Sequence, residues 1–261
     1  MESLHADRER AESFGFNADA YDRYRPSYAE ALMDDLAALG PADVLDIGCG
    51  TGKAAAQLTA RGLDVLGIDV DARMAEVART HGIPVEVGAF ETWDDRGRRF
   101  DLITAAQAWH WVQPAAGAAK AARLLRPGGT LCVFWNYFLP DEDPSELPEV
   151  AAAYRAHAPE LERLSDPQSR APRYAAGLRA SGLFATVATR SYPTVRRFTA
   201  SEFAGYVHTL SDHFALGPAR LTVLSQALGR AVEARGGVLE LRAATYAVFA
   251  TAAAETDATA R

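Results

Sequence analysis

The chain has 261 residues, 49% of them apolar and 23% charged, which is enough for one α/β domain with its own core and too few for two full-sized domains. Its net charge is −7 and its longest basic cluster is RGRR at 96–99, which argues against a nucleic-acid binder. The two cysteines indicate neither a disulfide framework nor a metal cluster, and no apolar run is long enough to span a membrane. The charged first segment, MESLHADRERAESF, contains no apolar leader, so we expect a cytoplasmic protein without metal, nucleic-acid or membrane partners.

The first half of the chain predicts a doubly wound, mainly parallel sheet, because short apolar runs alternate with helical patterns. A helical stretch over 18–39 comes first, interrupted near Arg25 because Pro26 disfavours helix in the residue before it. We then expect strands over 43–47, 64–69, 84–88, 100–107 and 130–136, with helices over 53–62, 71–82 and 115–125 and a turn at RPGG. Asp71 is the expected N-cap of its helix.

The alternation loosens in the second half. We expect a proline-rich connection with a short helix near 147–158, a helix over 173–182, a strand over 184–198, helical stretches over 199–214 and 218–235, and a strand over 237–252. A strand, a helical pair and a last strand predict an antiparallel sheet edge with a helical lid inserted. The predicted units are a mobile N-terminus (1–17), a core (18–137), a connection (138–172), a helix and strand that complete the sheet (173–198), the lid (199–236), and a final strand and tail (237–261).

The segment VLDIGCGTGK at 44–53 places three glycines directly after the first strand. Glycines there allow a sharp turn and let a ligand approach the amides at the start of the next helix. The spacing G-x-G-x-G is neither the dinucleotide fingerprint nor a Walker A loop, which argues against a nicotinamide dehydrogenase. Asp69 ends the second strand, where a carboxylate can accept both ribose hydroxyls; the alternative is an exposed aspartate that caps a helix.

Four segments, VLDIGCGTGK, GIDVDARM, FDLITAAQAWHWV and LLRPGGTL, resemble in order and spacing the motifs of class I S-adenosylmethionine-dependent methyltransferases, over about residues 18–136. The resemblance implies a Rossmann-like seven-stranded sheet with an antiparallel last strand, and S-adenosyl-L-methionine as cofactor. It implies these cofactor-binding residues: Asp46, Gly48, Cys49, Gly50, Thr51, Gly52, Asp69, Val70, Met74, Ala89, Phe90, Glu91, Gln107 and Ala108. Ala89 departs from the acidic residue that family members often carry at this point.

The segment AYDRYRPSY at 20–28 resembles the N-terminal segment with which some of these enzymes cover the cofactor. Tyr21, Tyr24 and Arg25 are its candidate contacts. The alternative is a surface helix with amphipathic tyrosines.

The chemistry is expected beyond the fourth strand, at QAWHW. His110 is the candidate catalytic base, since an imidazole can take a proton near neutral pH; alternatively it packs on the cofactor without acid–base work. AWHWV resembles the version of this motif in trans-aconitate and juvenile-hormone-acid methyltransferases. Their carboxylate substrates are ionised at pH 7 and need no base, so Arg25, Arg197 or a lid histidine would instead meet the negative charge.

The expected substrate side of the pocket combines the strand ends with one face of the lid, and its candidate residues are Trp111, Asn136, Tyr206, His208, Ser211 and His213. Packing of the lid against the body is the alternative for Tyr206, and the five-residue separation of His208 and His213 argues against a helical metal pair. The resulting hypothesis is a methyltransferase that methylates oxygen, as carboxylate or hydroxyl, on a small molecule. The alternative is an S-adenosylmethionine-binding protein of the same fold that catalyses a non-methylating reaction such as a cyclisation.

Overall fold

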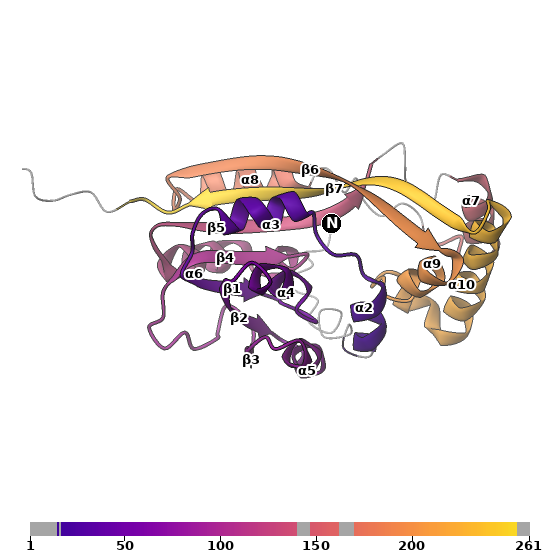
Figure 1. The fold of residues 1–261 in the computed structure, drawn as a ribbon, viewed down its shortest axis with the longest axis horizontal. Coiled ribbons are helices and arrows are strands. Elements are labelled where there is room, and N and C mark those ends of the chain that lie inside the picture. Colours follow the sequence, from indigo (N-terminus) through magenta and orange to yellow (C-terminus); the bar gives the residue numbers. More distant parts are fainter. Residues whose placement is uncertain (1–14, 16, 140–146, 162–169, 255–261) are drawn as a thin grey trace, which may run out of the picture.

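The computed structural model describes residues 15, 17–139, 147–161 and 170–254, which form one seven-stranded sheet in the order β3-β2-β1-β4-β5-β7-β6 (Figure 1). The strands are β1 Asp43–Ile47, β2 Asp64–Asp69, β3 Val85–Val87, β4 Phe100–Ala106, β5 Leu125–Phe138, β6 Thr186–Thr199 and β7 Val238–Thr251. The first five pair in parallel, and β7 runs antiparallel between β5 and β6. The predicted Rossmann-like sheet with an antiparallel last strand is therefore confirmed.

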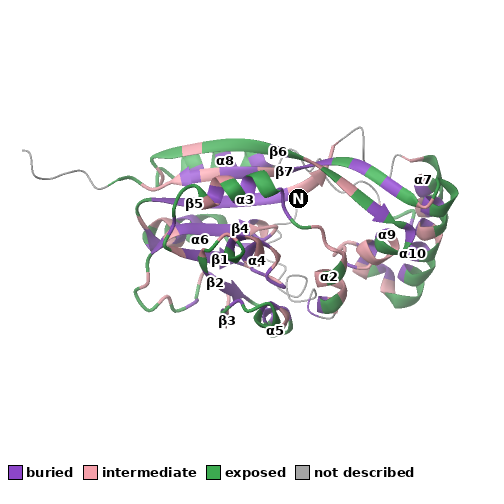
Figure 2. Cartoon of the chain, viewed as in Figure 1, coloured by how far each residue is buried: buried purple, intermediate pink, exposed green. Residues whose placement is uncertain are grey.

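Helices cover both faces of the sheet (Figure 1). On one face lie α3 Glu30–Ala37, α4 Lys53–Thr59 and α5 Ala72–Thr80, and on the other α6 Pro114–Leu124 and α8 Arg170–Ala180. In α3 the apolar side chains Leu32, Met33 and Leu36 recur at helical spacing on one side, and all three are fully buried. As Figure 2 shows, buried residues concentrate in the sheet and on the inner sides of its helices.

Two local predictions have different outcomes. Asp71 caps α5, as expected, by accepting a hydrogen bond from the backbone N–H of Arg73. The turn predicted at RPGG is wrong, because these residues belong to β5. Its pairing with β4 shifts register between Phe100 and Leu102, and this irregularity accommodates the extra residues.

A helical lid follows β6 and precedes β7, as predicted. It consists of α9 Ala200–Val207, the short 3₁₀ helix η7 His213–Leu216 and α10 Gly217–Ala234, and α7 Pro148–His157 packs against it. The long strands β6 and β7 extend past the other strands and carry these helices at one end of the molecule (Figure 1). The lid has a hydrophobic core of its own, in which Val150, Phe203 and Leu224 meet.

The helix predicted over 199–214 ends early, at Val207. A capping box between Thr199 and Glu202 starts it as the sequence suggests. The end comes from Thr209, whose backbone N–H and hydroxyl both donate to the carbonyl of Tyr206, at 2.9 and 2.6 Å. A hydroxyl side chain that bonds the preceding turn competes with the helix ladder. Residues 208–214 therefore do not continue the helical spacing of α9.

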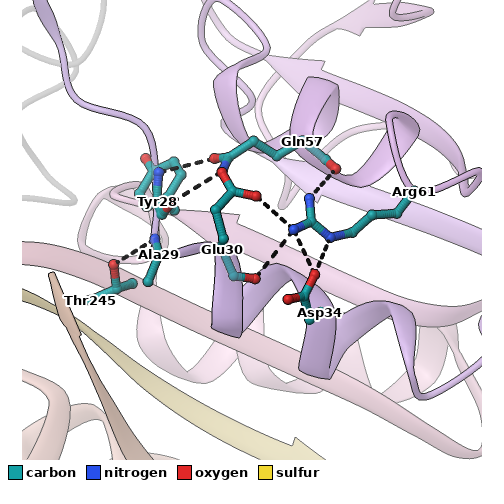
Figure 3. A network of polar contacts seen from close by, with 7 residues as sticks. All are labelled: Tyr28, Ala29, Glu30, Asp34, Gln57, Arg61 and Thr245. Carbon is teal, nitrogen blue, oxygen red and sulfur yellow. Dashed lines mark hydrogen bonds and ion pairs between the residues drawn. The ribbon is translucent and has the colours of Figure 1, made fainter.

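Residues 17–29, here called the strap, connect the lid to the body. The strap contains α2 Ala18–Tyr24, which packs against α9 and α5. Its far end is fixed to α4 by Gln57, which accepts from the N–H of Tyr28 at 3.0 Å and donates to its carbonyl at 3.1 Å (Figure 3). The hydroxyl of Thr245 on β7 accepts from the N–H of Ala29 at 3.1 Å. Each of these bonds satisfies a backbone N–H or carbonyl group that has no hydrogen-bond partner in a helix or in the sheet.

None of the helices in the described part of the chain combines the length and hydropathy that a membrane crossing requires.

Candidate functional site

A cavity lies where the carboxyl ends of β1, β4 and β5 meet the strap and the lid. The predicted site residues that line it are Tyr21, Arg25, Gly48, Cys49, Gly50, Thr51, Gln107, Asn136 and Tyr206. The structure adds lining residues that the sequence did not single out for the site, namely Pro26, Tyr28, Lys53, Ala54 and Ala106. Pro26 and Tyr28 belong to the segment AYDRYRPSY, and Lys53 ends the segment VLDIGCGTGK. Their membership in these two motifs was the signal that could have identified them.

The loop after β1 requires glycine at its turning points. Gly48, Gly50 and Gly52 have φ angles of +60°, +57° and +85°, in the left-handed region that L side chains rarely adopt. There is also no room for a side chain at Gly48, because a Cβ built there would lie 2.6 Å from the Cβ of Ala108. The loop is thus held close to the segment that leaves β4.

Asp69 fastens this loop to the end of β2. Its Oδ2 accepts from the N–H of Gly50 at 2.7 Å, and its Oδ1 accepts from the N–H of Asp71 at 2.9 Å. Burial raises its pKa to about 6, against the opposing effect of these backbone donors. The structure therefore gives Asp69 a structural task in the loop. That it also holds the ribose hydroxyls stays a prediction.

Asp46 lies fully buried beneath the same loop. Its Oδ1 accepts from the hydroxyl of Thr104 at 2.7 Å, whereas its Oδ2 has no hydrogen-bond partner among the described residues. Burial raises its pKa to about 7, with a smaller contribution from the charge of Asp69 and against the opposing effect of the Thr104 hydrogen bond. The buried hydroxyl of Thr51 is likewise without a partner in the described chain.

Five of the predicted cofactor-binding residues, which the family resemblance implies lie around the adenine, do not line the cavity; they are Val70, Met74, Ala89, Phe90 and Glu91. Phe90 is 4% exposed and packs near Trp109 in the core. The Oε1 of Glu91 accepts from the N–H of Gln113 at 2.7 Å, so this carboxylate holds the start of α6. Val70 is 37% exposed at the end of β2. The adenine site stays a prediction.

The loop that carries Phe90 is braced from the side facing solvent. Glu86 accepts from Trp93 Nε1 at 2.7 Å and from both terminal nitrogens of Arg98 at 2.9 Å. This bidentate ion pair lowers the pKa of Glu86. The guanidinium of Arg98 also lies over the ring of Trp93, 4.8 Å from its centroid.

His110 lies just outside the cavity, in the 3₁₀ helix η3 Trp109–Trp111. Its Nδ1 accepts a hydrogen bond from Trp135 Nε1 at 3.3 Å, and Trp135 in turn stacks on Tyr174. Trp111 contacts the His110 ring and does not line the cavity either. The side chain that reaches the cavity from this segment is Gln107, whose φ of +56° is unusual for a residue with a Cβ and whose amide donates to the carbonyl of Asn136 at 3.3 Å.

The lid contributes Tyr206 to the cavity, but not His208, Ser211 or His213. His208 hydrogen-bonds Ser225 within the lid at 2.8 Å. His213 is 4% exposed and hydrogen-bonds Tyr154 at 2.9 Å. The early end of α9 explains this outcome, because residues after Val207 leave the helix face that we used to predict their direction.

The candidate cations also differ from expectation. Arg197 points away from the site on edge strand β6, with its side chain 74% exposed and paired with Glu240 at 2.6 Å. Arg25 is in place, between the rings of Tyr21 and Tyr206 at 5.2 and 5.5 Å from their centroids. Arg196, one residue before Arg197, lies on the opposite side of β6 and donates to the carbonyl of Ser27 at 2.5 Å.

Comparison with known proteins agrees with this geometry. Residues 44–129 match the family model of a methyltransferase domain. An uncharacterised methyltransferase of Mycobacterium tuberculosis is 41% identical over 132 residues, which is 49% of this chain and 54% of that protein. A ubiquinone biosynthesis O-methyltransferase of Alkalilimnicola ehrlichii is 36% identical over 94 residues, 33% of this chain and 38% of that protein. The chain thus spans about half the length, or less, of these curated relatives.

Two solved structures share the fold. A putative type II methyltransferase from Anaeromyxobacter dehalogenans superposes with a TM-score of 0.60 at 24% identity, over 88% of this chain and 98% of that one. Phosphoethanolamine N-methyltransferase 2 of Haemonchus contortus superposes with a TM-score of 0.53 at 15% identity, over 98% of this chain and 61% of that one.

S-adenosylmethionine is the cofactor of this family, and the residues around the glycine loop fit it. The unpartnered buried oxygens of Asp46 and Thr51 can receive the polar groups of a ligand. The cavity has a volume of about 60 Å³, below the roughly 300–1,000 Å³ of small-molecule pockets, so we expect the strap to move outward as a nucleoside enters. In its sheet order, in its glycine loop and in the match over residues 44–129, the chain is similar to methyltransferase domains of the class I, S-adenosylmethionine-dependent type.

Proposed function

We propose that the protein transfers a methyl group from S-adenosylmethionine to an oxygen of a small organic molecule, and that this oxygen belongs to a carboxylate rather than a hydroxyl. The supporting observation is that no general base is ready among the described lining residues. Burial raises the pKa of the lining tyrosines and of Cys49, so all of these groups stay protonated near neutral pH; the tyrosines are Tyr21, Tyr28 and Tyr206. An acceptor that arrives ionised needs no such base.

Two remaining side chains were possible bases. Burial lowers the pKa of Lys53, which is the direction a base requires, but Asp22 lies 4.0 Å from its ammonium and favours the charged form. His110 accepts from Trp135 through Nδ1, and a neutral imidazole that accepts at one nitrogen carries its proton on the other. It could take a further proton only by giving up Trp135. We therefore assign His110 a positioning role toward the acceptor.

The bound cofactor would supply a methyl group already activated on a sulfonium. The chain's own residues then have three tasks. Asp46, Thr51 and the glycine-loop amides bind the donor, Gln107 and Tyr206 narrow the space in which the acceptor can lie, and the strap closes over both and excludes water. Alignment of three reacting atoms in a dry site is what this displacement requires.

The alternative is a cofactor-binding protein that catalyses a non-methylating reaction such as a cyclisation. Incubation of the protein with S-adenosylmethionine labelled in its methyl group and a library of small carboxylic acids and phenols distinguishes the two, with mass spectrometry of the products. We expect labelled methyl esters. Conversion of an acceptor without incorporation of the label would refute methyl transfer, and labelled phenol ethers alone would refute the preference for carboxylates.

Substitution of Asp69 by asparagine is expected to weaken binding of S-adenosylhomocysteine by about 1–3 kcal/mol, the cost of losing a charged hydrogen-bond acceptor. Asparagine has nearly the same shape and keeps one oxygen for the loop amides. Calorimetry gives the affinity. Asp101→Asn is the control, because it makes the same chemical change near the start of β4, whereas the cavity lies at the end of that strand. It should leave the affinity unchanged. Equal affinities for both variants would remove Asp69 from the cofactor site.

Replacement of His110 by alanine is expected to lower kcat about tenfold, rather than the 10²–10⁴-fold that follows loss of a general base. The pH–rate profile of the remaining activity should keep its wild-type shape across about pH 6 to 8, where a histidine base would titrate. Trp135→Phe removes the N–H that orients the imidazole, together with part of a buried ring, and should reproduce part of the defect. A profile whose acid limb disappears in His110→Ala would show that His110 is a base after all.

A further inference from the structure

Two arginines whose charges act on Tyr206 have no carboxylate partner among the described residues. Arg25 comes from the strap and Arg196 from β6, and the charges of both act on the phenol of Tyr206 and on that of Tyr28. Neither guanidinium forms an ion pair within the described part of the chain, although many of the arginines there do. Their Nε atoms are buried and have no hydrogen-bond partner among the described residues.

Such an arrangement costs free energy unless something compensates for it. A guanidinium carries five N–H donors and never loses its charge, so burial without an acidic partner leaves donors and charge unsatisfied. Burial is the main cause that lowers the pKa of Arg196, and the groups that act on it are phenols rather than carboxylates. The adjacent Arg197 shows the ordinary solution, with its exposed side chain paired to Glu240.

A purely structural role does not account for Arg196. It donates to the carbonyl of Ser27, but that oxygen already accepts from the amide of Asn136 at 3.1 Å. The strap is fixed here without Arg196, whose buried Nε has no partner among the described residues. Arg196 does not itself line the cavity, but the strap residue that it contacts, Ser27, lies between Pro26 and Tyr28, which both do. Arg25 uses one bond as well, to the carbonyl of Thr209 at 2.6 Å.

We propose that Arg196 and Arg25 together bind a carboxylate of the acceptor, and that Arg196 is the residue that makes the site specific for small organic acids. This rests on the proposed function and names the specificity of the same site. Arginine suits the task because its planar fork donates two parallel bonds to a carboxylate. The two guanidiniums approach from different elements, strap and sheet edge, so a bound acid would also draw the strap toward β6.

The test is calorimetric binding of straight-chain dicarboxylates, from succinate to suberate, and of the matching uncharged diamides, to protein saturated with S-adenosylhomocysteine. We expect at least one dicarboxylate to bind and its diamide to bind at least tenfold more weakly. Arg196→Gln should weaken dicarboxylate binding about tenfold or more, because a charge-assisted bond is lost, and should leave diamide binding unchanged. Arg196→Lys keeps the charge but not the fork and should fall between.

Arg197→Gln is the matched control, one residue away on the outer side of the same strand, and should bind like the wild type. Affinity for S-adenosylhomocysteine, measured on each variant, reports whether the strap and the cofactor site are intact. Failure of every dicarboxylate to bind, equal binding of acids and diamides, or equal losses in Arg196→Gln and Arg197→Gln would overturn the proposal. If acids bound specifically but no methyl ester formed, the carboxylate site at Arg196 and Arg25 would be supported and the proposed methyl transfer would be refuted.

Discussion

Replacing Gly48 with alanine is expected to destabilise the protein by about 2–5 kcal/mol and to abolish measurable cofactor binding. Two effects add. An L residue held at a φ of +60° costs about 1–2 kcal/mol, and a new methyl group forced into a packed region costs about 1–3 kcal/mol more. The second effect arises because the added Cβ would lie 2.6 Å from the Cβ of Ala108. Relief requires the loop to move away from β4, which displaces the amides that we expect to bind the cofactor.

Urea denaturation and calorimetry with S-adenosylhomocysteine measure the two effects. Gly40→Ala is a matched control, because Gly40 has a φ of +66° but no atom within 4 Å of an added Cβ. It should show only the backbone cost and keep full cofactor affinity. Adding Ala108→Gly to Gly48→Ala removes the opposing methyl and should recover the packing part of the loss. Equal destabilisation in Gly48→Ala and Gly40→Ala would show that contact with Ala108 is unimportant.

The parts of the site that the sequence predicted well are those set by local chemistry. A run of glycines after an apolar strand can be recognised without knowing the rest of the fold, because only glycine tolerates the left-handed turns and close contacts found there. Asp69 follows from the same logic, since the end of the neighbouring parallel strand must lie beside that loop. The order of strands and helices was predictable for a similar reason, as alternating units leave few topologies.

The directions of the lid histidines and the choice of the arginine that faces the strap depend on contacts between residues far apart in the sequence. Both were predicted poorly, although the lid itself was found where it was expected. The direction of His208 and His213 depends on where α9 ends, and a single hydroxyl of Thr209 decides that. The choice between Arg196 and Arg197 depends on which side of β6 faces the strap. In TRSYPTVRRF the polar and apolar residues do not alternate regularly, so this edge strand has no pattern from which its inner side can be assigned.

The role of His110 shows a further limit. The sequence placed it at the end of the fourth strand, next to the expected site, but its proton state depends on Trp135, which lies on the neighbouring strand. Two residues 25 positions apart meet only through the pairing of β4 with β5. Sequence spacing identifies a histidine near the chemistry. It cannot say which ring nitrogen is already engaged.

Substitution of Asp46 by asparagine is expected to stabilise the protein relative to the wild type at high pH while weakening cofactor binding. In the folded protein burial raises the pKa of Asp46 to about 7, from its ordinary 3.8. A carboxyl whose folded pKa is raised contributes its full stability below its unfolded pKa and loses that contribution as the pH rises through the folded value. The wild type should therefore lose about 2–3 kcal/mol between about pH 5 and 8 through this group, and the variant should not.

Urea denaturation at both pH values gives the comparison, and Asp101→Asn supplies a control of opposite sign. The N–H groups of Ala42 and Asp43 and the Arg126 guanidinium hold the pKa of Asp101 below its usual value, against the effect of its partial burial. That contribution is present above the unfolded pKa, so Asp101→Asn should destabilise the protein about equally at both pH values. Asparagine at position 46 also turns a free acceptor oxygen into a donor, so affinity for S-adenosylhomocysteine should fall although stability rises. If Asp46→Asn instead lost as much stability between pH 5 and pH 8 as the wild type does, titration of the buried Asp46 carboxyl could not be the cause of that loss.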